Sequence, residues 1–96
     1  MAAARIDAAG EIDATTAPGL RTSVYEAIDA NPGEVVTVDL SRVEFLDSTG
    51  LGVLVGALKH ARTGGGDIAL DGAPAHVWKV FQITGLDRVF TAKAPG

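Results

Sequence analysis

The segment Val35–Leu40 restricts the fold more strongly than any other part of the sequence. It is rich in β-branched residues and nearly continuous in apolar character, which is typical of a strand in a parallel sheet that is covered on both faces. Apolar residues at helical spacing occur before it, up to Asn31, and after it, from Ser48 to Gly64. Strands that alternate with helices over short links imply right-handed crossovers. The pattern therefore predicts an α/β fold with a largely parallel sheet.

Further strands and helices are expected along the rest of the chain. The expected strands cover residues 3–9, 35–40, 67–71 and 86–91, the last of them centred on Val89 and Phe90. Residues 41–46 are expected to form a connection. The expected helices begin at Thr16 or Ala17, at Ser48 or Thr49, and at Pro74. They end at breakers, which are Asn31-Pro32-Gly33, Gly64-Gly65-Gly66 and Gly85.

Composition narrows the class of protein. The 96 residues are the size of one domain, so residues 1–96 are expected to fold as a single unit. A net charge of −4 argues against nucleic acid and anionic membrane as partners, because phosphate binding needs a basic face. No apolar run approaches the ~20 residues that span a bilayer, and Met1–Ala4 lacks the basic region of a signal peptide. We therefore expect a cytoplasmic location.

No cofactor or metal site is expected. The chain contains no cysteine, which excludes thiolate metal sites and disulfides. Its two histidines, His60 and His76, have no carboxylates near them at metal-ligand spacing. Gly64-Gly65-Gly66 follows a helix and lacks the lysine and hydroxyl of a phosphate-binding loop.

The segment Asp47-Ser48-Thr49-Gly50 stands where a predicted buried strand and its connection lead into a helix. Asp, Ser and Thr are preferred helix caps, because their side-chain oxygens accept hydrogen bonds from free backbone N–H groups. Capping alone is therefore one explanation of the segment. A single cap needs only one such oxygen, however, and here three stand in a row. A helix amino end also carries about half a positive charge and unpaired N–H donors, which suit an added phosphate.

The helix that follows contains glycines at positions 50, 52 and 56. Each interior glycine costs about 1 kcal/mol of helix stability relative to alanine, so three of them need a reason. Ser48, Gly52 and Gly56 are spaced by four and share one stripe of the helix. We expect this stripe to form a smooth surface that a sheet or a partner protein approaches closely.

Three blocks of residues resemble one protein family. The central block reads Phe45-Leu46-Asp47-Ser48-Thr49-Gly50-Leu51-Gly52-Val53-Leu54. It resembles the signature of STAS domains, in the branch of the bacterial anti-sigma-factor antagonists. Two further blocks are similar to other parts of the family pattern. The family's first block is similar to Gly10-Glu11-Ile12-Asp13, with Ala17 and Leu20 after it. The block near the family's end is similar to Phe81-Gln82-Ile83-Thr84-Gly85-Leu86. The resemblance implies an α/β, STAS-like mixed, mainly parallel sheet of about four strands, with helices packed on it.

The resemblance implies a partner-switching protein rather than an enzyme. In this family the unphosphorylated antagonist binds an anti-sigma factor that is also a serine kinase, and so frees the sigma factor. The kinase then phosphorylates the serine after the motif aspartate, here Ser48, and a serine phosphatase reverses the step. Thr49 is the second candidate acceptor. The partner-facing surface implied by the motif consists of Asp13, Asp47, Ser48, Thr49, Gly50 and Leu51.

Both ends of the chain depart from the family pattern, and other functions stay open. The family's extra first strand has few residues here, and its final helix is missing, so the fold is expected to be shortened at both ends. The exposed sheet edge that results favours weak self-association.

Two alternative functions stay open. A STAS scaffold subunit of a sensory or lipid-transport complex would need only the fold and a hydrophobic interface. A nucleotide-binding or hydrolysing enzyme would need a phosphate loop or an arranged base, neither of which this sequence supplies.

Overall fold

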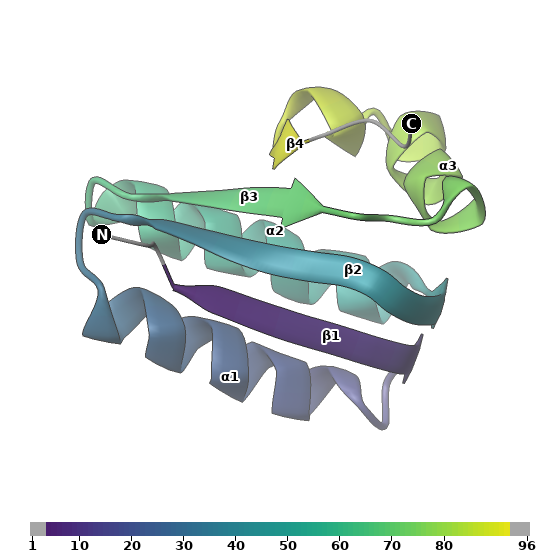
Figure 1. The fold of residues 1–96 in the computed structure, drawn as a ribbon, viewed down its shortest axis with the longest axis horizontal. Helices are drawn as coiled ribbons and strands as arrows, with labels where there is room; N and C mark the ends of the chain where they lie inside the picture. The colour runs from purple at the N-terminus through teal and green to yellow at the C-terminus, as the bar shows by residue number, and fades with distance from the viewer. Residues whose placement is uncertain (1–3, 93–96) are drawn as a thin grey trace.

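The alternation of strands and helices is confirmed in the computed structural model, which describes residues 4–92 (Figure 1). Its elements are, in order, β1 (Arg5–Ile12), α1 (Ala17–Ala30), β2 (Val35–Leu46), α2 (Ser48–Thr63), β3 (Asp67–Asp71), α3 (Ala75–Thr84), the 3-10 turn η1 (Leu86–Arg88) and β4 (Thr91–Ala92). The strands lie in the order β1-β2-β3-β4, and every neighbouring pair is parallel. β4 has only two residues, so β1, β2 and β3 form the body of the sheet. The expected α/β fold is confirmed.

The predicted helix starts and stops agree with the structure to within one residue, because they depend on strong local signals. Pro18 lies in the first turn of α1, where its missing N–H costs no hydrogen bond. The glycines after residue 63 follow the end of α2, and Gly64 is its C-cap. Gly85 ends α3 with a φ of 77°, a left-handed conformation that glycine adopts without strain.

One face of the sheet is covered and the other is open. Val36, Val38 and Leu40 of β2 are fully buried in the core beneath α1 and α2. Val35 is 41% exposed, and Thr37 and Asp39 are only half-buried. Figure 1 shows no helix of the described chain in front of β1–β3. The prediction that β2 is covered on both faces is therefore wrong, because α1 and α2 pack together against the same side.

The predicted bounds of the first, second and last strands are also wrong. β1 extends to Ile12, and β2 continues through the expected connection 41–46, because the second half of β2 pairs with β1 up to Ile12↔Leu46. The last strand lies at residues 91–92 rather than around Val89 and Phe90. Phe90 instead packs edge-on against Phe81 of α3, with ring centroids 5.8 Å apart. The part of the expected first strand at Ala3 lies outside the described residues.

Strand β2 carries more residues than β1 over the same length of ladder. The register moves from Asp7↔Asp39 to Ala9↔Arg42, and from Gly10↔Val43 to Glu11↔Phe45. At each step β2 contributes one extra residue, which is the definition of a β-bulge. Bulges bend a strand and change which side chains face the core. Local apolar patterning cannot show them, so the sequence pattern predicts a connection where the second half of β2 lies.

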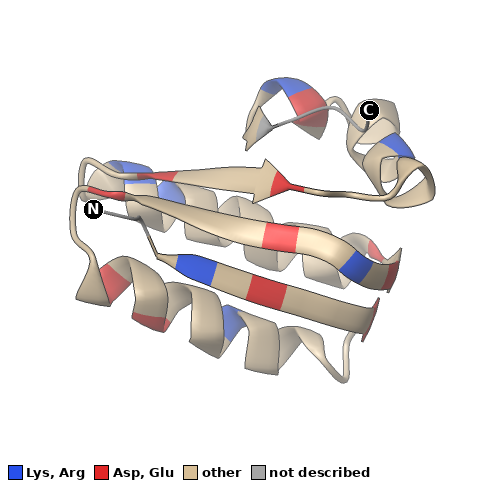
Figure 2. Cartoon of the chain, in the orientation of Figure 1, with Lys and Arg blue, Asp and Glu red and all other residues tan. Residues whose placement is uncertain are grey.

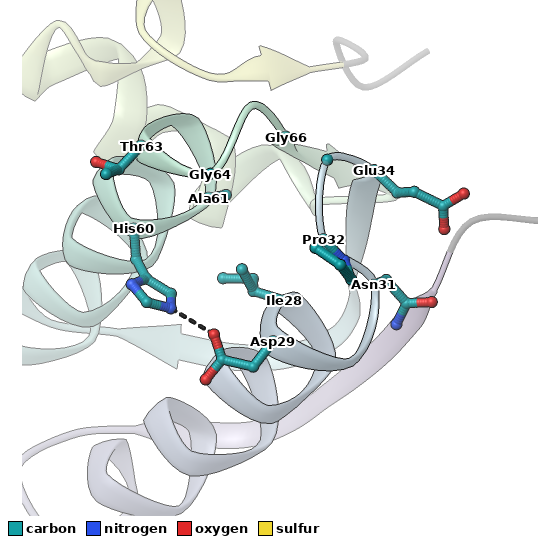
Figure 3. A pocket seen from close by; sticks show the side chains of 11 residues that line it. Ile28, Asp29, Asn31, Pro32, Glu34, His60, Ala61, Thr63, Gly64 and Gly66 are labelled. Carbon is teal, nitrogen blue, oxygen red and sulfur yellow. Dashed lines mark hydrogen bonds and ion pairs between the residues drawn. The ribbon is translucent and has the colours of Figure 1, made fainter.

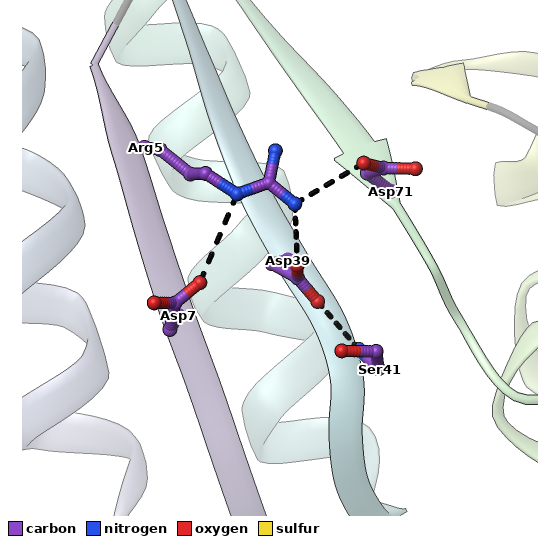
Figure 4. Close-up of polar contacts among 5 residues, drawn as sticks. All are labelled: Arg5, Asp7, Asp39, Ser41 and Asp71. Carbon is purple, nitrogen blue, oxygen red and sulfur yellow. Dashed lines mark hydrogen bonds and ion pairs between the residues drawn. The ribbon is translucent and has the colours of Figure 1, made fainter.

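Polar side chains join the strands across the open face (Figure 4). The guanidinium of Arg5 on β1 forms ion pairs with Asp39 on β2 and with Asp71 on β3, the latter at 3.2 Å. Hydrogen bonds from Ser41, together with the charge of Arg5, lower the pKa of Asp39 to about 2. This network replaces apolar packing as the link between the strands on the solvent side.

Candidate functional site

The carboxyl ends of β1 and β2 place two aspartates at the same edge of the sheet. The strands run parallel and in register at Ile12↔Leu46, and Asp13 and Asp47 are the next residues along each chain segment. The backbone N–H of Asp47 donates a hydrogen bond to the carbonyl of Ile12 at 3.1 Å. The motif aspartate is therefore held by the neighbouring strand, and residues far apart in sequence form one edge.

Asp47 caps helix α2. One of its carboxylate oxygens, Oδ1, accepts hydrogen bonds from the backbone N–H groups of Thr49 at 2.9 Å and Gly50 at 3.1 Å. Asp13 does the same for the turn before α1, since its Oδ1 accepts from Thr15 at 2.9 Å and Thr16 at 3.2 Å. Asp47 thus satisfies backbone donors that a helix start leaves unpaired, and Asp13 holds the turn that leads into α1.

Ser48 is the first residue of α2 and is exposed. Because Asp47 already serves as the cap, the Ser48 hydroxyl is not needed for it. Among the described residues the hydroxyls of Ser48 and Thr49 make no hydrogen bond within the chain. Capping by Asp47 therefore explains the helix start and leaves two neighbouring hydroxyls at its exposed amino end.

Gly50 and Leu51 lie beneath this edge rather than on it. A Cβ at Gly50 would stand 2.5 Å from Leu46 Cδ1 and 2.7 Å from Ile12 Cγ2, so only glycine lets the helix start approach the strands this closely. Leu51 is 7% exposed and belongs to the core. Four of the expected partner-facing residues are therefore exposed or half-buried, namely Asp13, Asp47, Ser48 and Thr49. The other two, Gly50 and Leu51, are buried beneath them.

The glycine stripe of α2 has two different environments. A Cβ at Gly56 would come within 3.0 Å of the Tyr25 hydroxyl, so this position brings α1 and α2 together. A Cβ at Gly52 would meet no atom within 4 Å. The sheet approaches at Gly50 instead, which the spacing by four did not indicate. Gly52 leaves an open surface one turn after Ser48.

Acidic residues surround the start of α2. Figure 2 shows red segments at the carboxyl ends of β1 and β2, where Glu11 and Glu44 lie, with Arg42 as the nearby basic residue of β2. Asp13 and Asp47 add two carboxylates at the same edge. The positive end of the α2 dipole therefore lies within an otherwise acidic surface.

His60 lies away from this edge and is held by protein groups. His60 Nε2 is 2.7 Å from Asp29 Oδ1 and its ring stacks on Tyr25, with centroids 4.9 Å apart. His60 and Asp29 border a pocket between the carboxyl ends of α1 and α2, at the opposite end of α2 from Ser48 (Figure 3).

No group of three or more His, Cys, Asp or Glu side chains within the described residues is arranged to hold a metal ion. None of the helices described is both long and apolar enough to cross a bilayer.

Known proteins are similar in sequence to this chain. A family model described as "Mlab, STAS domain" matches residues 1–91. The chain is 41% identical over 85 residues to the anti-sigma-B factor antagonist of Listeria monocytogenes, covering 88% of this chain and 74% of the relative. It is 36% identical over 94 residues to the anti-sigma-B factor antagonist of Bacillus subtilis, covering 96% of this chain and 84% of the relative.

Solved structures share the fold. The anti-sigma factor antagonist SpoIIAA in its unphosphorylated form superposes with a TM-score of 0.77 at 26% identity, over 94% of this chain and 78% of that one. The Bacillus cell fate determinant SpoIIAA in its phosphorylated form has the same fold, with a TM-score of 0.69 at 24% identity over 94% and 81% of the two chains. The chain belongs to the STAS domain family. Its named relatives are regulatory antagonists rather than enzymes.

Proposed function

We propose that this chain is an anti-sigma-factor antagonist that is switched by phosphorylation of Ser48. The unphosphorylated form binds an anti-sigma factor with serine kinase activity and frees the sigma factor, and the phosphorylated form does not bind. The observation that carries the proposal is that Asp47 caps α2 and leaves the exposed Ser48 hydroxyl unused. The names of the relatives support the class of partner.

The start of α2 can accept a phosphate without loss of the fold. A phosphoserine adds roughly −1.5 to −2 charges and three acceptor oxygens. The positive end of the helix dipole favours negative charge in the first turn. Ser48 is exposed, so the phosphate can extend into water and displaces no core side chain. The fold shared with both forms of SpoIIAA supports this expectation.

The same phosphate should oppose docking. A partner that covers Ser48 must remove water from the phosphate and from the neighbouring carboxylates of Asp13 and Asp47. Desolvation of several negative charges together is costly unless the partner supplies matching cations. Phosphorylation therefore acts on binding, and a serine phosphatase would restore the binding form. We propose that the protein itself catalyses no reaction and needs no cofactor.

The experiment is phosphate transfer from ATP. The chain is incubated with kinase-type anti-sigma factors from its source organism and ATP, and the phosphosite is mapped by mass spectrometry. We expect phosphate on Ser48 in the wild type. The Ser48→Ala variant is the control and should lose most of the signal, with any remainder on Thr49. No phosphate on either residue with every candidate kinase would overturn the proposed switch and favour a scaffold role.

A further inference from the structure

Phe45 is a large apolar side chain that the fold holds in solvent. It is 51% exposed, although it lies near the end of the longest strand and next to Leu46, which is 3% exposed. Its ladder partner on β1 is Glu11, which is also exposed. Phe45 therefore stands on the open face of the sheet, three residues before Ser48.

The second bulge of β2 produces this exposure. In a regular strand alternate residues face the same side, so Phe45 would face the core together with Val43. Glu44 is instead the extra residue, since Gly10 pairs with Val43 and Glu11 with Phe45. Val43 and Leu46 are consequently buried, and Glu44 and Phe45 both face out. The bulge turns an aromatic ring away from the core and onto the open face, near the end of β2 that leads into Ser48.

His76 holds the bulge from outside the sheet. Its Nε2 lies 2.8 Å from the backbone carbonyl of Glu44, and because a carbonyl only accepts, His76 Nε2–H is the donor. His76 is in the first turn of α3, which packs through Val77, Trp78 and Phe81 into the core. The extra residue of β2 thus accepts a hydrogen bond from a helix that is packed into the core.

We propose that Phe45 is the apolar anchor by which the anti-sigma factor docks beside Ser48, and that His76 is the positioning residue for it. This inference rests on the proposed function and names the residue that contributes the binding energy. Interfaces draw most of their affinity from a few residues, often aromatic, that enter pockets of the partner. Because Phe45 precedes Asp47 by two residues and Ser48 by three, we expect a partner that encloses it to reach this edge as well, where docking would desolvate a phosphate.

Affinity measurements on matched variants test the anchor. Phe45→Thr removes the ring and keeps a β-branched residue in the strand. Val35→Thr is the control, because Val35 is an exposed apolar residue on the same strand and face, at its other end. With the kinase-type anti-sigma factor as probe, Phe45→Thr should bind roughly 30-fold or more weakly than wild type. Val35→Thr should bind as wild type, and thermal unfolding verifies that both variants are folded.

Two variants, each compared with wild type, separate the inference from the proposed function. If Phe45→Thr binds within about threefold of wild type while Ser48→Asp binds weakly, the anchor is overturned and the switch stands. If Phe45→Thr binds weakly while Ser48→Asp binds as wild type, the anchor stands and the switch is overturned. If no anti-sigma factor of the source organism binds the wild type, both are overturned.

The positioning role has its own readout. His76→Ala removes the donor to the Glu44 carbonyl and should lower affinity about tenfold, together with a shift of the backbone NMR signals of Glu44 and Phe45. His76→Gln offers an amide donor in its place and should restore both. Wild-type affinity in His76→Ala would overturn the positioning role, as would failure of His76→Gln to improve on it.

Discussion

Asp47 caps α2, whereas the proposed role of Ser48 as phosphate acceptor makes no contribution to the cap, and stability measurements can distinguish the two residues. Asp47 accepts two backbone hydrogen bonds at the start of α2. Asp47→Ala should therefore lower the free energy of unfolding by about 1 kcal/mol, as expected for loss of a cap. Ser48→Ala should change it by less than about 0.5 kcal/mol, because the hydroxyl is exposed. Urea unfolding of the two variants checks this; an equal loss in both would mean that Ser48 shares the cap.

Gly50 and Gly52 allow a comparison within one turn of α2. Alanine is a better helix former than glycine by about 1 kcal/mol, so propensity alone predicts that both substitutions stabilise the protein. Gly52→Ala should do so, since its Cβ meets open space. Gly50→Ala should instead destabilise by about 1–3 kcal/mol, because the Cβ would overlap Leu46 and Ile12. Thermal unfolding of the pair gives the answer, and stabilisation by Gly50→Ala would show that the close approach is not needed.

At the scale of elements, helix α2 should survive phosphorylation. The phosphate adds negative charge at the helix amino end, where the dipole favours it. Circular dichroism of the chain before and after phosphorylation should show the same helix content. A large loss of helical signal would mean that the switch works by unfolding α2 rather than by changing what its end can bind.

The open face of the sheet should make stability depend on acid pH. Asp39 has a pKa of about 2 in the fold against an ordinary value of 3.8, through Ser41 first and then Arg5. A lowered pKa stabilises the fold above the ordinary value, and this contribution is lost as the pH falls through the folded-state value. Between pH 3.8 and about 2, wild type should therefore lose more stability than Asp39→Asn, which does not titrate. Urea titrations at each pH test this; equal losses would assign the acid sensitivity to other carboxylates.

The elements also show what the sequence could and could not predict. The three helices and β3 follow from proline, glycine and apolar spacing, all of which act locally. The second half of β2 has no such signal, because its extra residues make sense only against the ladder with β1. One local signal does indicate the open face: Thr37 and Asp39 are polar residues at alternate positions of an apolar run.

For the candidate site, the sequence predicts the segment but not which of its residues lie at the surface and which are buried. Asp47, Ser48 and Thr49 stood out as three oxygens where one suffices. The burial of Gly50 and Leu51 depends on how β1 and β2 approach α2, which no local pattern encodes. Phe45 and His76 were missed as a pair because their connection runs through the Glu44 backbone carbonyl.

At the scale of the whole molecule, topology rather than sequence proximity assembles the surface. Parallel β1 and β2 bring Asp13 beside Asp47, and α3 reaches the bulge of β2 through His76. The pocket near His60 lies at the carboxyl end of α2, and none of the residues that line it belongs to this surface. In the proposed function, a partner that docks at the Ser48 edge meets this surface, and one added phosphate would control the contact without altering the fold.

Isothermal titration calorimetry tests this control most directly. The kinase-type anti-sigma factor is titrated with the unphosphorylated chain and with the same chain phosphorylated at Ser48, at one salt concentration and without ATP. We expect the unphosphorylated chain to bind and the phosphorylated chain to bind at least about 30-fold more weakly, since covering the phosphate costs roughly 2 kcal/mol or more. Equal affinities for the two forms would show that Ser48 phosphorylation is not the switch.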